Sequence, residues 1–149
     1  CAANATTTLA TCMTTTGVGA GTWGFKYKVI YQAAATTTGV DFAINHTGSG
    51  SVVTASSWFV TTGGSAANAI GDQVASNTAN LVEGKSARAL NTKTGSTLGV
   101  DTANANMLMV IEGTLVVTNS GQLELNHASE VAASSQVMAD TLLELHKVN

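Results

Sequence analysis

The amino-acid sequence predicts an all-β protein, an antiparallel β-sandwich that is jelly-roll-like and carries a loose N-terminal arm. Two observations predict this class. Apolar and polar residues alternate in several short runs, and turns rich in Gly, Thr, Ser and Asn separate those runs. A barrel of the same strands is the alternative architecture. We expect one sandwich domain at residues 22–149, preceded by an arm or linker at residues 1–21.

The composition excludes two classes of partner. Only 10% of the residues are charged, against about 25% in an average soluble domain, and the formal net charge is −3. Six basic residues cannot supply the cluster of cations with which nucleic-acid-binding proteins neutralise phosphates. No run of 18 apolar residues is present. We therefore expect neither a nucleic acid nor a membrane as a partner.

The first 21 residues are mostly Ala, Thr, Gly and Cys, which is too little apolar surface for a core element. They are expected to form an arm, a linker or an edge strand. Both cysteines, Cys1 and Cys12, lie here, and a bridge between them would add at most about 3 kcal/mol. Because no second Cys/His pair stands at zinc-ligand spacing, free or locally paired thiols are favoured over a metal site.

The strongest strand signal spans residues 22–33. Aromatic and β-branched residues occupy every second position there: Trp23, Phe25, Tyr27, Val29 and Tyr31. Lysines lie between them, so one face is predicted to be buried and the other exposed. The same alternation at residues 40–45 predicts a second strand, paired with the first through the connection at residues 36–39.

The middle of the chain is less regular. Residues 52–54 and 58–61 predict a third strand, closed by Gly63 and Gly64, and a short helix could begin at Ala66. Two short strands are expected at residues 81–84 and 87–90, around a turn at residues 84–86. Residues 92–102 are rich in turn-forming residues.

The last third contains three further predicted strands. Residues 107–118 are nearly continuously apolar, which indicates a strand that is buried on both faces or crosses between sheets. This stretch and the aromatic run of residues 23–31 are expected to form two layers packed face to face. Residues 122–126 form a short return strand. The final strand, from Leu142, should point Leu143 and Leu145 inward and Glu144 and His146 outward, with a helix capped by Asp140 as the alternative.

No group of residues indicates catalysis. His46, His127 and His146 have no second ligand at metal-binding spacing and are interpreted as solvated strand or turn residues, while the nine acidic residues are scattered. Glu130 is expected to accept hydrogen bonds from backbone N–H groups in a turn. Asn4 and Asn45 match the N-glycosylation acceptor pattern. We therefore predict no catalytic, cofactor-binding or metal-binding residues, and no enzyme.

Three pieces of the chain, taken in order, resemble a known family. They are residues 27–42 with their Ala-Ala-Ala-Thr-Thr-Thr-Gly-Val run, residues 111–114 with 121–125, and residues 128–131 with Val137 and the terminal strand. Together they resemble the β-sandwich module of virion proteins of tailed bacteriophages. The resemblance implies a non-enzymatic structural protein on the virion surface, a capsid decoration or fibre module that self-associates, as a homotrimer, and docks on a major capsid or tail protein.

Two other functions remain open. A tail-fibre module could bind a host receptor or surface glycan through loops near Trp58 or at residues 91–102. A bacterial surface adhesin or lipoprotein is the other alternative, and Cys1 is the residue that would distinguish it.

Overall fold

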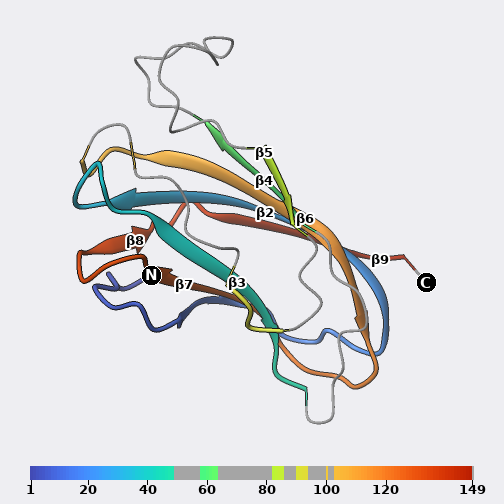
Figure 1. The fold of residues 1–149 in the computed structure, drawn as a ribbon. Helices are drawn as coiled ribbons and strands as arrows, with labels where there is room; N and C mark the ends of the chain where they lie inside the picture. Colours follow the sequence, from blue (N-terminus) through green and yellow to red (C-terminus); the bar gives the residue numbers. More distant parts are fainter. Residues whose placement is uncertain (49–57, 64–81, 86–89, 94–99, 101–102, 149) are drawn as a thin grey trace.

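The computed structural model describes residues 1–48, 58–63, 82–85, 90–93, 100 and 103–148, and these form two antiparallel sheets (Figure 1). The larger sheet contains β2 (Gly21–Ala33), β4 (Trp58–Gly63), β5 (Val82–Lys85), β6 (Met107–Val117), β8 (Ser135–Val137) and β9 (Leu142–Lys147). The smaller sheet contains β1 (Ala10–Thr14), β3 (Val40–His46) and β7 (Leu123–Ser129). The predicted all-β sandwich is thereby confirmed.

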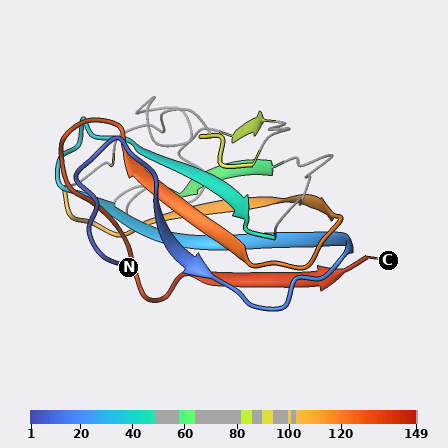
Figure 2. The same ribbon diagram turned by 90° about the horizontal axis from the view of Figure 1, so that it is seen from below.

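The strands pair in a nested order along the chain, so that the two strands of each inner pair lie in sequence between the two strands of the pair outside it. β2 pairs with β9, β3 with β7, and β4 with β6, and these pairs lie alternately in the larger, the smaller and the larger sheet. Figure 2 shows the smaller sheet crossing diagonally in front of the larger one. Such nesting of antiparallel pairs across two layers is the jelly-roll-like arrangement expected from the sequence.

The aromatic run lies on β2 as predicted. Its inward face holds Phe25, Tyr27 and Tyr31, all 2% exposed or less, while the lysines lie on the opposite face. Across the core, the ring of Tyr31 meets that of Phe42 on β3 edge to face, with centroids 5.7 Å apart. These contacts join the two layers, because β2 and β3 belong to different sheets.

Two predicted pairings are wrong. β2 and β6 do not face each other as two layers. They are neighbours in one sheet, paired from Gly21 with Val117 to Tyr31 with Met107. Likewise β3 does not pair with β2 but with β7. Alternation shows which side of a strand is buried, but it does not show which strand lies beside it.

β6 also differs from its prediction. It stays in one sheet along its whole length and has one buried face, since Met107, Met109 and Ile111 are buried while Leu108 is 41% exposed. It is therefore neither buried on both sides nor a crossing strand. The apolar residues on its second face, such as Val110, are only half-buried.

The N-terminal segment is tied to the sandwich rather than loose. Of the possibilities left open by the sequence, Ala10–Thr14 forms an edge strand, β1, paired with β7. Val18 is fully buried in the core and forms an isolated bridge with Gly121. The side chains of this segment are mostly small and bury little apolar surface. Backbone hydrogen bonds therefore hold the segment against the sandwich.

The final strand is confirmed. β9 begins at Leu142, and Leu143 and Leu145 pack against the core while Glu144 and His146 are exposed. Within the described residues no helix long and apolar enough to cross a membrane is present. The expected strand at residues 52–54 and the helix from Ala66 lie outside the described residues. Of the strand expected at residues 87–90, only Leu90 is described, and it lies in a turn. The turn expected at residues 84–86 is partly replaced by strand, because β5 continues through Lys85.

Candidate functional site

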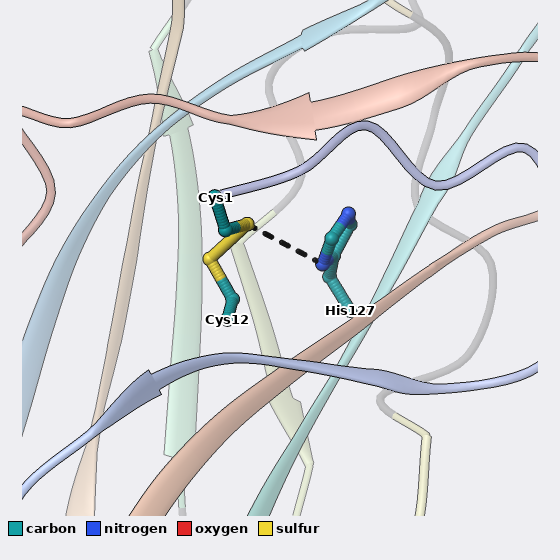
Figure 3. A group of neighbouring side chains, drawn as sticks. All are labelled: Cys1, Cys12 and His127. Atoms are coloured by element: carbon teal, nitrogen blue, oxygen red, sulfur yellow. Dashed lines mark hydrogen bonds between the residues drawn. A yellow bond between two sulfur atoms is a disulfide. The ribbon is translucent and has the colours of Figure 1, made fainter.

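The folded chain brings Cys1, Cys12 and His127 together, although they are far apart in sequence (Figure 3). Cys1 and Cys12 form a disulfide, with their Cα atoms 5.2 Å apart. The Nδ1 atom of His127 lies 3.8 Å from Cys1 Sγ. One ligand atom from each residue lies within 4.8 Å of the other two. We call this group the Cys–His cluster.

Two elements of the smaller sheet position the cluster. β1 pairs with β7 so that Ala10 lies opposite His127, and the register shifts between Thr11 and Met13. Cys12 occupies this irregularity. A bulge of this kind changes the direction of a side chain at the edge of a sheet. Cys12 thereby packs against the core beside the inward-facing His127.

Residues 1–9 run along β8 and the end of β7, and main-chain bonds hold them there. The backbone nitrogen of Cys1 donates to Val137 O at 2.7 Å. Asn4 and Ser135 exchange two backbone hydrogen bonds, of 2.8 and 2.9 Å. Ser129 N donates to the carbonyl of Thr6 at 2.9 Å. Since none of these bonds involves a sulfur atom, the disulfide is not the only attachment of this segment.

The side chain of Asn4 fixes the same segment from inside. Its Nδ2 donates to the carbonyl oxygens of Thr8 and His127, both at 3.0 Å, and its Oδ1 accepts from Thr6 N at 3.0 Å. Asn4 is only 8% exposed. The amide nitrogen that a glycan would occupy is therefore engaged in the fold.

Two of the three histidines are not solvated, contrary to the sequence interpretation. His127 is 1% exposed and His46 is 4% exposed, because both lie on the inward faces of their strands. Burial lowers the pKa of His127, and backbone groups of Ser135 and Ala10 act in the opposite direction. Its Nε2 has no hydrogen-bond partner among the described residues. His146 alone is exposed.

A second candidate site lies on the face of the larger sheet that points away from the core. A shallow groove of about 390 Å³ is lined there by Gly24, Phe25, Lys26, Glu112, Gly113, Thr114, Glu144, His146 and Val148. The ring of His146 lies directly over Gly24, where a Cβ atom would collide with it. We call this the outer groove.

Ion pairs cross the strands of the outer groove. Lys26 Nζ lies 2.9 Å from Glu112, and Lys28 Nζ lies 2.5 Å from Glu144. The first pair raises the pKa of Lys26, and hydrogen bonding to Lys28 lowers the pKa of Glu144. The carboxylate of Glu144 is thus held in the charged form beside a cation, which suits binding by hydrogen bonds more than proton transfer.

Other residues singled out from the sequence have structural roles. As expected, the carboxylate of Glu130 accepts a hydrogen bond from a backbone N–H group, that of Gly39, at 3.0 Å. Asn45 donates to Glu124 at 2.7 Å. Trp23 is half-buried, and its indole N–H donates to Gly19 O at 2.8 Å. The side chain of Trp58 lies outside the described part of the chain.

His127 is the functional candidate that sequence reasoning did not pair with the cysteines. It stands 115 positions after Cys12 in the sequence. No local spacing links them, and only the pairing of β1 with β7 brings them together. Compared with protein-family models, with curated proteins and with solved structures, the chain matches none.

Proposed function

We propose that this chain is a non-enzymatic structural module of a virion, which self-associates through the outer face of its larger sheet and docks on the particle surface. The assignment to a virion and the expected trimeric state both rest on the resemblance to phage β-sandwich modules. The observation that carries the self-association is the outer face itself, whose described residues are apolar at one end and carry paired charges in the middle.

The apolar end of this face has two exposed leucines. Leu108 on β6 is 41% exposed and Leu142 on β9 is 49% exposed. Leu108 lies opposite Ile30, and Leu142 lies opposite Lys28 on the same strand β2. Directly opposed residues share a face, so both leucines project from the same side of the sheet. Apolar side chains gathered on one exposed face are typical of interaction surfaces.

The charges in the middle suit a second copy of the chain. Glu112, Lys26 and Glu144 stand in one row across β6, β2 and β9. A copy displaced by one strand would place a lysine opposite a glutamate. The row therefore offers charge complementarity to itself, which favours a copy of this chain as the occupant.

The opposite outer surface, on the smaller sheet, is already covered. Asn91 N donates to Ile44 O at 2.9 Å, and Asn91 Oδ1 accepts from Asn126 at 2.7 Å. Lys93 lies 3.1 Å from Asp41, which is 6% exposed. Asn91 and Lys93 thus contact both β3 and β7, so the larger sheet offers the more open face for association among the described residues.

Sedimentation equilibrium of the intact protein tests the self-association. We expect a species of higher mass than the 15.0 kDa chain, three times that mass for a trimer. Leu108→Lys and Leu142→Lys should shift the equilibrium toward the monomer, because each places a charge in the interface. Val131→Lys is the matched control, since Val131 is 46% exposed but lies in the turn after β7.

A strictly monomeric protein at high concentration would contradict the proposal. So would variants at Leu108 and Leu142 that associate as strongly as the Val131 control. Electron microscopy of labelled phage particles tests the virion assignment separately, and its failure would leave the measured association in place.

A glycan-binding module is the second candidate, and the outer groove favours it. Its lining combines carboxylates, a lysine and an imidazole, which can donate to and accept from sugar hydroxyls. Binding to a glycan array that Glu112→Gln weakens would support this function. No glycan binding, together with saturable binding to phage particles, would favour the structural role.

The lipoprotein alternative would need a free thiol at Cys1 for attachment of the lipid, and the disulfide occupies that thiol.

A further inference from the structure

The Cys–His cluster contains the donor atoms of a metal site in an oxidised state. Two cysteine sulfurs and one imidazole nitrogen form a ligand set typical of Zn²⁺. In the oxidised protein, however, a disulfide joins the two sulfurs, so they are not available as thiolate ligands. We propose that, once this disulfide is reduced, the cluster binds Zn²⁺ through Cys1 Sγ, Cys12 Sγ and His127 Nδ1.

The distances in the oxidised protein are close to those the metal needs. In a tetrahedral site with Zn–S bonds of about 2.3 Å and Zn–N bonds of about 2.0 Å, a sulfur and a nitrogen lie roughly 3.5 Å apart. Cys1 Sγ and His127 Nδ1 already lie 3.8 Å apart. When the disulfide breaks, the two sulfurs must move apart, and Cys12 Sγ, which lies within 4.8 Å of the imidazole, must settle at a similar distance from it. Three protein ligands leave the fourth position of Zn²⁺ for water.

The ligands remain in place after reduction because other bonds hold them. Cys1 is fixed by its backbone nitrogen on Val137 O and by its carbonyl, which accepts from Gln136 Nε2 at 3.1 Å. The paired backbones of Asn4 and Ser135 fix the following residues. Cys12 belongs to β1 and His127 to β7, which are paired strands. Such preorganisation lowers the entropic cost of assembling a metal site.

The imidazole is buried and directed into the cluster. His127 is 1% exposed, and Figure 3 shows its Nδ1 edge facing the sulfur of Cys1. Cys1 itself is exposed and Cys12 is half-buried, so a reductant and a hydrated ion both have access. The cluster is therefore closed on the histidine side and open on the cysteine side.

The chemistry balances with a small dithiol as reductant. The S–S bond accepts two electrons and two protons and becomes two thiols, while the dithiol loses the same two electrons and two protons and closes to a cyclic disulfide. Zn²⁺ then replaces the two thiol protons as two Zn–S bonds form, and these protons pass to solvent. The disulfide is favoured outside cells and the thiol form in a reducing cytosol.

Titration of the reduced, full-length protein with Co²⁺ and Zn²⁺ tests the site. We expect one Co²⁺ per chain, with the intense near-ultraviolet band of thiolate-to-cobalt charge transfer, and loss of this band when Zn²⁺ is added. The oxidised protein should show no such band. Cys12→Ser should show a weaker band at most, because a single thiolate remains.

The variant His127→Gln distinguishes Zn²⁺ binding by all three proposed ligands from Zn²⁺ binding by the two thiols alone. We expect it to weaken Zn²⁺ binding by at least about tenfold relative to wild type, as the loss of a ligand requires. His146→Gln is the matched control, since that histidine is exposed on the other sheet and should leave the affinity unchanged. Equal affinities of the His127 variant and the wild type would overturn the proposal.

The state of the fold after reduction is followed by near-ultraviolet circular dichroism. If the reduced chain keeps its native spectrum, absence of the cobalt band at excess metal overturns the proposal. If the reduced chain unfolds, Zn²⁺ should restore the native spectrum, because the three ligands converge only in the folded state. Failure to restore it would likewise overturn the proposal.

Discussion

At the scale of single residues, Tyr27 stands out among the buried side chains. It lies fully inside the sandwich, and its hydroxyl has no hydrogen-bond partner among the described residues. Burial, together with the charge of Glu124, raises the pKa of this phenol well above its ordinary value. The ring therefore stabilises the core by its apolar area, while the hydroxyl adds a desolvation cost.

Replacing Tyr27 with Phe should not destabilise the protein. The substitution keeps the ring and removes the buried hydroxyl, whose desolvation costs about 1–3 kcal/mol when it is unpaired. We expect the free energy of unfolding in urea at neutral pH to stay equal to that of the wild type or to rise. A loss of more than about 1 kcal/mol would show that the hydroxyl makes a stabilising hydrogen bond.

The same variant should alter the stability at alkaline pH. In the unfolded chain Tyr27 loses its proton near pH 10, whereas in the folded protein its raised pKa retains the proton. Below pH 10 the two states bind the same number of protons. As the pH rises above 10 the unfolded state is favoured, so stability is lost. Unfolding at pH 9 and 11 should show a smaller loss for Tyr27→Phe than for wild type.

At the scale of elements, the turn between β6 and β7 is held by a close backbone approach. Gly121 exchanges two hydrogen bonds with Val18, of 2.9 and 3.1 Å, and its Cα lies against the backbone of Gly48. A Cβ at this position would collide with Gly48 N and with the ring of His46. The turn therefore requires glycine for space, although the backbone angle is not a left-handed one.

Gly121→Ala should destabilise the protein, since backbone atoms cannot move aside as a flexible side chain can. We expect a loss of about 1–3 kcal/mol, the usual cost of overpacking. Gly19→Ala is the matched control, because its Cβ would meet only Ser120 Oγ, at an ordinary 3.6 Å. Thermal unfolding of both variants measures the difference. Equal melting temperatures would show that the Gly48 segment moves away freely.

At the scale of the whole molecule, the two sheets are joined along one side by the N-terminal segment. Residues 1–9 contact β8 of the larger sheet through Ser135 and Val137, and the disulfide connects this segment to β1 of the smaller sheet. This arrangement closes the sandwich on the side of β1 and β8 (Figure 1). The covalent bond therefore adds to the backbone hydrogen bonds by which this segment already links the two layers.

Cys12→Ser should lower the free energy of unfolding by up to about 3 kcal/mol, the loop-closure value for a short loop. The sequence separation of the two cysteines is 11. Hydrogen exchange measures where the change occurs. We expect the exchange of the amide protons of Asn4 and Ser135 to speed up more than that of the paired centres of β2 and β6, which exchange only through global unfolding. Unchanged exchange at Asn4 would show that the backbone bonds alone hold the segment.

Local patterns were sufficient to place several strands and their faces. The alternation from Trp23 to Tyr31 predicted which side of β2 is buried, and the alternation after Leu142 predicted β9 with Leu143 inward. Burial of one face imposes a period of two on any strand, whichever strand is its neighbour. This is why the prediction of strand faces succeeded even where the predicted pairing was wrong.

The amino-acid sequence by itself determined the all-β class and the inward side of strands such as β2 and β9. Only the tertiary structure decided that β2 lies beside β6, that β3 belongs to the other sheet, and that His127 meets Cys1 and Cys12. The physical reason is the sequence distance between the contacting residues. Side-chain periodicity is set by adjacent residues, whereas the pairing of β2 with β6, the pairing of β3 with β7 and the contact of His127 with the cysteines join residues more than seventy positions apart.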